Sequence, residues 1–233
     1  MLWRPPILMY HSIYRTTQHP VGVPLQNFKE HMDYLARKGW RGVSMREHFA
    51  SPSSNNICIT FDDGYKNNLD LATPILQDLN FSATFFVMSN PKAAFHWHTD
   101  SPQPLLSFKD METLAQQGHE VAAHGFSHSN LTTCSPSELK YEILEAKQVL
   151  KNVVGDVIGF AYPYGAFNQS TLKYVSEQFD YACATRYSFF KPETRWSLRR
   201  IGINYKDSLM RFKQKTTFPF RLLCDAGIYT TIK

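Results

Sequence analysis

The sequence has no uninterrupted apolar run long enough to cross a bilayer, although 43% of its 233 residues are hydrophobic. Only 19% of the residues are charged, which is typical of a globular protein and argues against disorder. A Gly/Ser-rich linker and an internal repeat are both missing, so we expect a single domain over residues 1–233. The first residues, MLWRPPILMYHSIY, do not read as a signal peptide, because Pro5 and Pro6 interrupt a short apolar stretch. We therefore expect a cytoplasmic location, or an extracellular or periplasmic one if an export signal has been lost.

Cysteine is scarce and widely spaced. No C-x-x-C pattern joins Cys58, Cys134, Cys183 and Cys224, so we expect neither a zinc ribbon nor a redox pair. A chain of this size with four cysteines does not resemble a disulfide-stapled scaffold. Cys58 and Cys183 fall in expected strands, where a buried free thiol is common.

The net charge is small, at +5, and the excess of basic residues is concentrated near the end of the chain. Residues 195–233 hold nine Lys or Arg against two Asp. Such a segment can mark a nucleic-acid or anionic-membrane contact. No nucleic-acid motif accompanies it, so we favour a solvated surface and expect no nucleic-acid partner. The oligomeric state is left open.

Strand-like runs alternate with helical patterns throughout, which predicts a parallel sheet with helical crossovers. Their number favours a closed barrel over an open sheet. A polar, proline-containing insertion at 89–106 is a candidate lid. The expected strands are 7–11, 40–43, 57–61, 83–87, 119–123, 157–162, 181–185 and 198–203. The expected helices are 27–39, 45–50 after Ser44, 66–79 with a restart at Pro74, one after Ser107, one after Ser135, and about 170–179.

Polar side chains gather at the ends of these strands, which is where parallel α/β barrels carry their chemistry. Because the carboxyl ends of the strands meet at one barrel mouth, residues far apart in sequence are expected to converge there. The residues concerned are His11, Asp62, Asp63, His124, His128 and the segment 162–165.

The adjacent carboxylates of Asp62 and Asp63 repel each other, and burial strengthens that repulsion. A divalent cation would relieve it by binding one carboxylate and leaving the other free as a base. The imidazoles of His124 and His128 are natural partners, because one carboxylate and two neutral imidazoles suit Zn²⁺ and leave a position for water. The pKa of such a water falls to about 7. The same donors also accept Co²⁺ or Ni²⁺.

Other histidines give weaker signals. HEVAAH (119–124) has one residue too many for the H-E-x-x-H of zinc proteases, and its strand pattern places His119 and His124 on opposite faces. His96 and His98 lie in the insertion without a carboxylate nearby, so we expect them to face solvent or substrate.

Three segments resemble the motifs of the polysaccharide deacetylases, the NodB-homology or carbohydrate esterase family 4 enzymes. TFDDGY (60–65) is similar to their first motif and HGFSHSNL (124–131) to their second, H-S/T-x-x-H, with Gly125 at the Ser/Thr position. FAYPYG (160–165) resembles the third, often R-x-P-Y-G. The resemblance covers about residues 7–203 and implies a deformed (β/α)₇ barrel that binds an N-acetylated carbohydrate.

The resemblance also implies a role for each matching residue. Asp62 would be the general base, and Asp63, His124 and His128 would hold the metal. The backbone N–H of Tyr164 would stabilise the oxyanion. Further residues of the first and third motifs are implied as substrate contacts: Tyr65, Tyr162, Pro163 and Gly165.

Two departures from the family pattern bear on the chemistry. Ala161 replaces the third-motif Arg that usually orients the catalytic Asp, so Arg200 or no residue at all takes that part. The late L-x-H motif, which usually supplies the acid, is missing, since no histidine follows His128. ILMYHSI (7–13), however, looks like the opening of the poly-N-acetylglucosamine deacetylases. There a histidine acts as the acid, which makes His11 the candidate acid here or a buttress of the site.

Our leading functional hypothesis is a metal-dependent N-deacetylase of N-acetylated amino sugars. The second is a deacylase of a small or lipid-linked N-acyl substrate, which a cytoplasmic location would favour. The third is a catalytically impaired carbohydrate-binding barrel, which the missing Arg and late His favour. A basic nucleic-acid binder is the weakest alternative.

Overall fold

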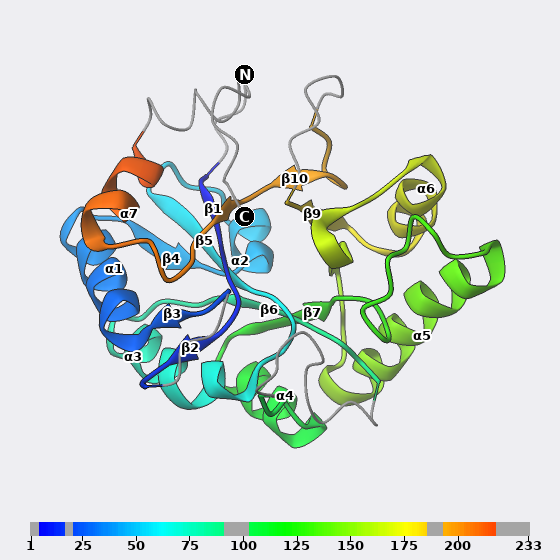
Figure 1. Cartoon of the computed structure of the whole chain (residues 1–233), viewed down its shortest axis with the longest axis horizontal. Helices are drawn as coiled ribbons and strands as arrows, with labels where there is room; N and C mark the ends of the chain where they lie inside the picture. Colours follow the sequence, from blue (N-terminus) through cyan, green and yellow to red (C-terminus); the bar gives the residue numbers. More distant parts are fainter. Residues whose placement is uncertain (1–4, 17–20, 91–102, 186–192, 218–233) are drawn as a thin grey trace.

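A parallel sheet forms the centre of the molecule, and helices pack around it (Figure 1). The computed structural model describes residues 5–16, 21–90, 103–185 and 193–217. From edge to edge the strands follow the order β10-β9-β8-β7-β6-β5-β1-β11. Their bounds are β1 (Ile7–Tyr10), β5 (Asn56–Phe61), β6 (Thr84–Val87), β7 (Glu120–Ala123), β8 (Gly159–Ala161), β9 (Tyr181–Ala184), β10 (Leu198–Arg199) and β11 (Ile201–Gly202). A further strand, β4 (Arg41–Val43), pairs in parallel with the first half of β5.

Helices connect the strands and cover the outside of the sheet (Figure 1). Ser44, Ser107 and Ser135 cap three of them as predicted, each accepting a hydrogen bond from the backbone N–H three residues later. The α-helices are α1 (Leu25–Arg37), α2 (Met45–Ala50), α3 (Thr73–Asp78), α4 (Phe108–Gln116), α5 (Pro136–Val154), α6 (Gln169–Gln178) and α7 (Leu209–Thr216). A π-helical turn, Asn68–Ala72, precedes α3, and a 3₁₀ turn, Pro163–Gly165, follows β8.

One short segment almost closes the sheet into a barrel. Strand β10 pairs with β9, whereas β11 pairs with β1 at the opposite edge. Only Arg200 separates the two strands in sequence. The prediction of a single strand at 198–203 is therefore wrong, because the chain changes pairing partner in its middle.

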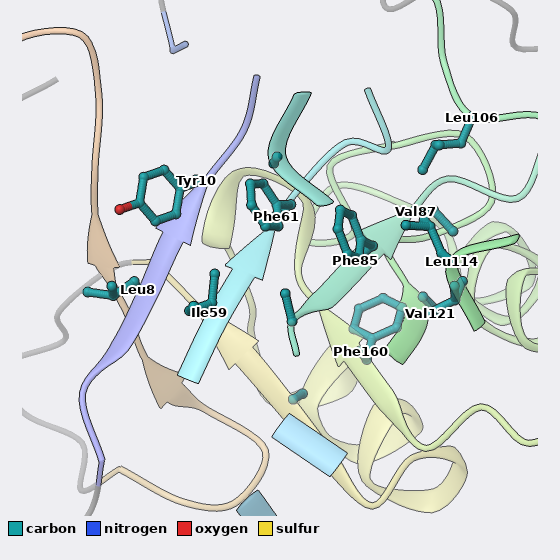
Figure 2. Close-up of a cluster of buried hydrophobic side chains, with 14 of the residues drawn as sticks. Leu8, Tyr10, Ile59, Phe61, Phe85, Val87, Leu106, Leu114, Val121 and Phe160 are labelled. Carbon is teal, nitrogen blue, oxygen red and sulfur yellow. The ribbon is translucent and has the colours of Figure 1, made fainter. Parts of the chain in front are cut away.

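Side chains alternate between two buried clusters, as the period of a strand requires. In Figure 2, Tyr10, Phe61 and Phe85 lie side by side on the face that packs against the helices. The Phe61 and Phe85 rings stack with centroids 4.8 Å apart. The second cluster includes Cys58, Phe86, Ala122, Ala161 and Cys183, one from each of five successive strands. Continuing β5 and β7 by one step directs Asp62 and His124 to this inner face.

Some elements were not predicted. A small parallel pair, β2 (Ile13–Tyr14) with β3 (Val23–Pro24), is too short to show a period, and α7 has a weak apolar stripe in which Phe212 is the main buried residue. Of the candidate lid, residues 91–102 lie outside the described residues, as do His96, His98 and Cys224. Its described end is anchored beside the first motif, because Leu106 N–H donates to the Gly64 carbonyl at 2.8 Å.

Among the described residues, no helix combines the length and the apolar character needed to cross a membrane.

His31 on α1 is buried between β1 and α7. Its Nε2 donates to the Asp207 carbonyl at 3.1 Å, and its Nδ1 accepts from the Tyr10 hydroxyl at 3.3 Å. The ring stacks on Phe212 with centroids 4.0 Å apart. Burial lowers the pKa of His31 to about 4.

This low pKa predicts acid destabilisation. In the unfolded chain His31 takes up a proton near pH 6.5, whereas in the folded protein it stays neutral down to about pH 4. Its contribution is therefore complete above pH 6.5 and is lost as the pH falls towards 4. We expect the free energy of unfolding to fall by up to about 3 kcal/mol more in the wild type than in His31→Gln over this interval. Urea titrations at both ends of the interval measure this, and equal losses would contradict the prediction.

Candidate metal centre

The strand register brings the predicted site residues to one level of the barrel mouth. Tyr10 pairs with Phe61 across β1 and β5, and Ala123 pairs with Phe160 across β7 and β8. The residues that follow these pairs therefore leave the sheet together. They include His11, Asp62 and His124.

Asp63, His124 and His128 form a compact, buried group of three ligand-type side chains. Asp63 Oδ1 lies 3.3 Å from His124 Nε2 and 3.2 Å from His128 Nε2. One ligand atom from each residue lies within 4.8 Å of the others. Asp63 and His128 adopt left-handed backbone angles, with φ of 69° and 62°, as strained residues at functional sites often do. The structure thus brings together the three predicted metal ligands.

The hydrogen bonding of His124 suits a metal ligand. Its Nδ1–H donates to the Ala161 carbonyl at 2.8 Å, which leaves the Nε2 lone pair facing Asp63. A lone pair and a carboxylate oxygen repel unless a proton or a cation lies between them. Burial alone would lower the pKa of His124, but the neighbouring Asp63 and Asp62 raise it above its usual value. The donor set of one oxygen and two nitrogens therefore fits Zn²⁺, Co²⁺ or Ni²⁺.

Asp62 has a different partner, Arg200. The guanidinium donates from Nη1 to Oδ1 at 2.6 Å and from Nη2 to Oδ2 at 2.7 Å. Both side chains are buried, and burial would raise the pKa of Asp62, but the charge of Arg200 lowers it below its usual value. Arg200 therefore makes the contact with the first-motif Asp that the resemblance assigns to a third-motif Arg, which is Ala161 in this chain. Removing one member of such a buried pair typically costs about 3–5 kcal/mol.

His11 lies at the rim of this site. Burial would raise the pKa of Asp63, but hydrogen bonds with His124 and His128 lower it well below its usual value. The charge of His11 adds to the lowering of the pKa of both Asp63 and Asp62, which places it within electrostatic reach of the two carboxylates.

Asn68 holds the backbone from His11 to Ile13, because its Nδ2 donates to the His11 carbonyl and its Oδ1 accepts from the Ile13 N–H. Asn68 was not predicted from the sequence, because its full burial and its contacts with the chain around His11 appear only in the structure.

The third-motif turn presents one residue to solvent. Tyr164 is 44% exposed, has a φ of 59°, and places its ring against that of His128 with centroids 4.7 Å apart. A Cβ at Gly165 would come within 1.5 Å of Thr185, so a glycine is required there for close packing. Pro163 is also buried, beside Gly125.

Two tyrosines predicted to contact substrate are buried. The Tyr162 side chain lies in the outer core with its hydroxyl donating to the Trp196 carbonyl at 2.9 Å, because position 162 shares the face of Phe160. Its side chain thus supports the turn instead of facing the mouth. Tyr65 is fully buried beside Asp63, and burial followed by the Asp63 charge raises its pKa.

Glu142 on α5 holds the loop that carries His124 and His128, a role that was not predicted from the sequence. Its carboxylate accepts four hydrogen bonds, from the Phe126 and Ser127 N–H groups and from the Ser127 and Ser129 hydroxyls. A Cβ at Gly125, where φ is +77°, would lie 3.2 Å from Glu142 Oε2. This contact accounts for glycine at the family's Ser/Thr position.

These contacts predict that Glu142 supports metal binding. In Glu142→Gln, an amide NH₂ replaces one acceptor oxygen, so we expect Zn²⁺ affinity to fall about 10–100-fold. Competition with a chromogenic chelator measures the affinity, and circular dichroism verifies the fold. Glu145→Gln, one turn farther along α5, is the matched control and should bind as the wild type does. Equal affinities in the two variants would contradict the prediction.

Comparisons with known proteins agree with this geometry. The polysaccharide deacetylase family profile matches residues 50–184. A Bacillus subtilis protein named for this family, YxkH, is 31% identical over 72% of this chain and 59% of its own length. A peptidoglycan-N-acetylglucosamine deacetylase of Bacillus cereus is 28% identical over 66% of this chain and 54% of its own length. The chain thus spans less than two thirds of the length of these curated relatives.

The fold is shared with solved structures. The Streptococcus pyogenes deacetylase PplD, solved in complex with acetate, superposes with a TM-score of 0.80 over 91% of this chain and 98% of its own, at 23% identity. This likeness confirms the expected deformed (β/α)₇ barrel. On the strength of the matched profile and the B. subtilis relative, this chain belongs to the polysaccharide deacetylase family.

Proposed function

We propose that this chain is a metal-dependent hydrolase that removes N-acetyl groups from N-acetylated amino sugars. One observation carries the proposal: the two adjacent buried carboxylates have separate partners. Asp63 faces two imidazole nitrogens, whereas Asp62 is paired with Arg200. Such a division provides one metal ligand and one unligated, ionised base.

The chemistry follows from these roles. A divalent cation bound by Asp63, His124 and His128 would polarise the acetamide carbonyl and acidify a water. Asp62 accepts a proton from the attacking water, whose oxygen bonds to the carbonyl carbon. The backbone N–H of Tyr164 donates to the oxygen that becomes negatively charged.

The second half of the reaction needs an acid. The carbon–nitrogen bond breaks, and His11 donates a proton to the departing nitrogen. The products are acetate and the free amine. Arg200 keeps both Asp62 oxygens oriented, and its charge keeps that carboxylate ionised at neutral pH.

The alternatives find less support. The missing Arg and late His favour a binding-only barrel, but the pairing of Arg200 with Asp62 and the nearness of His11 to both carboxylates support a catalytic site. The name of the B. cereus relative supports an amino-sugar polymer as the substrate. A deacylase of lipid-linked amino sugars would use the same residues. Only the choice of substrate distinguishes it from the proposed function.

Acetate release tests the proposal. We expect the zinc-loaded chain to release acetate from chitooligosaccharides or poly-N-acetylglucosamine and to stop when the metal is chelated. Asp62→Asn should lower turnover by about 10²–10⁴-fold because the base is lost, yet still bind Zn²⁺. Asp63→Asn should lose both. Acetate release that survives chelation, or that Asp62→Asn leaves intact, would refute the mechanism, and release only from a lipid-linked amino sugar would favour the second function.

His11 is tested with substrates that differ in their leaving group. We expect His11→Ala to lower turnover of an N-acetylated sugar by about 10²–10⁴-fold, because an amine must be protonated to leave. Turnover of p-nitrophenyl acetate should change little, because its phenolate leaves without a proton. A variant that loses both activities equally would indicate a structural role, and near-normal turnover of the sugar would remove His11 as the acid.

A further inference from the structure

A buried ion pair lies next to the segment that closes the barrel. Lys215 on α7 places its Nζ 2.8 Å from Asp207 Oδ2, and both side chains are buried. Neither residue belongs to the metal centre or to the third-motif turn. We propose that this pair positions Arg200, and through Arg200 the Asp62 carboxylate, for proton transfer. The proposal rests on the proposed function and adds two positioning residues to it.

The segment that carries Arg200 needs such support because its own strand pairing is short. β10 and β11 have two residues each, and Arg200 is the single residue between them. β11 meets β1 in two Cα pairs, Leu8 with Ile201 and Met9 with Gly202. So short a pairing specifies its register weakly, and a slip by one residue would turn side chains to the opposite face of the sheet. Other contacts must therefore keep the Arg200 side chain directed into the barrel.

Lys215 supplies one of these contacts directly. Its Nζ donates to the Gly202 carbonyl at 2.7 Å as well as to Asp207. Gly202 is the last residue of β11 and lies two positions after Arg200. On the β1 side, the Ile203 N–H donates to the Met9 carbonyl at 2.9 Å. The end of β11 is therefore held both by β1 and by the ammonium group of α7.

Asp207 connects the turn after β11 with helix α1. Its Oδ2 accepts from the Asn204 N–H at 2.8 Å, so the atom that binds Lys215 also closes this turn. Its backbone carbonyl accepts from the side chains of His31 and Asn27 on α1, at 3.1 and 3.3 Å. In Figure 1, α7 lies beside α1 on the left of the barrel. The pair is thus anchored to two packed helices.

Stability alone is a poor reason for a buried ion pair. Taking two charges out of water costs free energy that their attraction recovers only in part, and apolar residues of similar size often stabilise a fold as well or better. The best-attested use of such a pair is to specify one register. Two-residue strands have that need, and here the register decides where Arg200 meets the base.

The contacts of Arg200 carry the effect to the site. Its guanidinium donates to both oxygens of Asp62, at 2.6 and 2.7 Å, and both side chains are buried. A guanidinium that donates two parallel hydrogen bonds fixes the plane of the carboxylate as well as its position. A displacement of β11 would therefore move the proposed base and leave the three candidate metal ligands in place.

Turnover of the zinc-loaded chain tests the proposal. The double variant Asp207→Asn with Lys215→Met removes both buried charges, so neither is left unpaired. We expect its kcat on the acetylated sugar that the wild type deacetylates to fall about 10–100-fold, because a misplaced base transfers protons poorly. KM and Zn²⁺ affinity should stay unchanged. Lys213→Met, at an exposed position of the same helix, is the matched control and should behave as the wild type does.

An unchanged kcat in the double variant, or an equal loss of Zn²⁺ affinity, would contradict the proposal. A second background then asks whether the pair acts through Arg200. Arg200→Lys keeps the positive charge but loses the two parallel hydrogen bonds to Asp62. In this background the double substitution should cause no further loss of kcat. Losses that multiply would show that the pair acts independently of Arg200 and would overturn the proposal.

An NMR measurement separates this proposal from the proposed function. A guanidinium held by two hydrogen bonds rotates slowly, so the Nη protons of Arg200 should give separate signals, which Arg200→Lys identifies by their loss. We expect these signals in the wild type and in Lys213→Met, and their collapse in the double variant. Their persistence in the double variant, or their absence from the wild type, would overturn the proposal. Collapse in a chain whose wild type releases no acetate from any sugar would support the positioning of Asp62 and refute the hydrolysis alone.

Discussion

Repulsion between two neighbouring buried carboxylates is the constraint on which the rest of the site depends. The protein resolves it by turning Asp62 and Asp63 in different directions, with a left-handed backbone at Asp63. One carboxylate meets a fixed guanidinium and the other meets two imidazoles that suit a cation. Because each charge is neutralised separately, both can stay ionised in a place that water barely reaches. Two aspartates that are adjacent in sequence thereby lie in different electrostatic environments.

The segment that carries Arg200 both closes the sheet and orients Asp62, the proposed base. Arg200 lies at the one position where the chain leaves the pairing with β9 and joins β1. Its side chain points into the barrel and also lies over the Phe86 ring, 5.3 Å from the centroid. The orientation of Asp62 therefore depends on the same residues that close the barrel. A loss of closure would release the Asp62 carboxylate, and removal of that carboxylate would leave the buried Arg200 guanidinium without its ion-pair partner.

Local periodicity carried most of the sequence prediction. Alternation along β5 and β7 places Asp62 and His124 inward, and the strand-end rule brings the three candidate metal ligands together. The same alternation would have shown Tyr162 to face outward with Phe160. Side chains whose contacts join elements distant in sequence were harder to predict, and they include Arg200, Asn68 and Glu142. Strands of two residues, such as β10 and β11, are too short to show any period, so their pairing follows only from the closed sheet.

Gly125 and Glu142 lie 17 residues apart in the sequence but are in close contact in the structure. A substitution at one of these positions therefore affects which residues fit at the other. A side chain at position 125 would meet both an unfavourable backbone angle and the Glu142 carboxylate that braces the loop. A shorter side chain at position 142 would lose the hydrogen bonds with which Glu142 holds the loop. We therefore expect the energetic effects of substitutions at positions 125 and 142 to be non-additive.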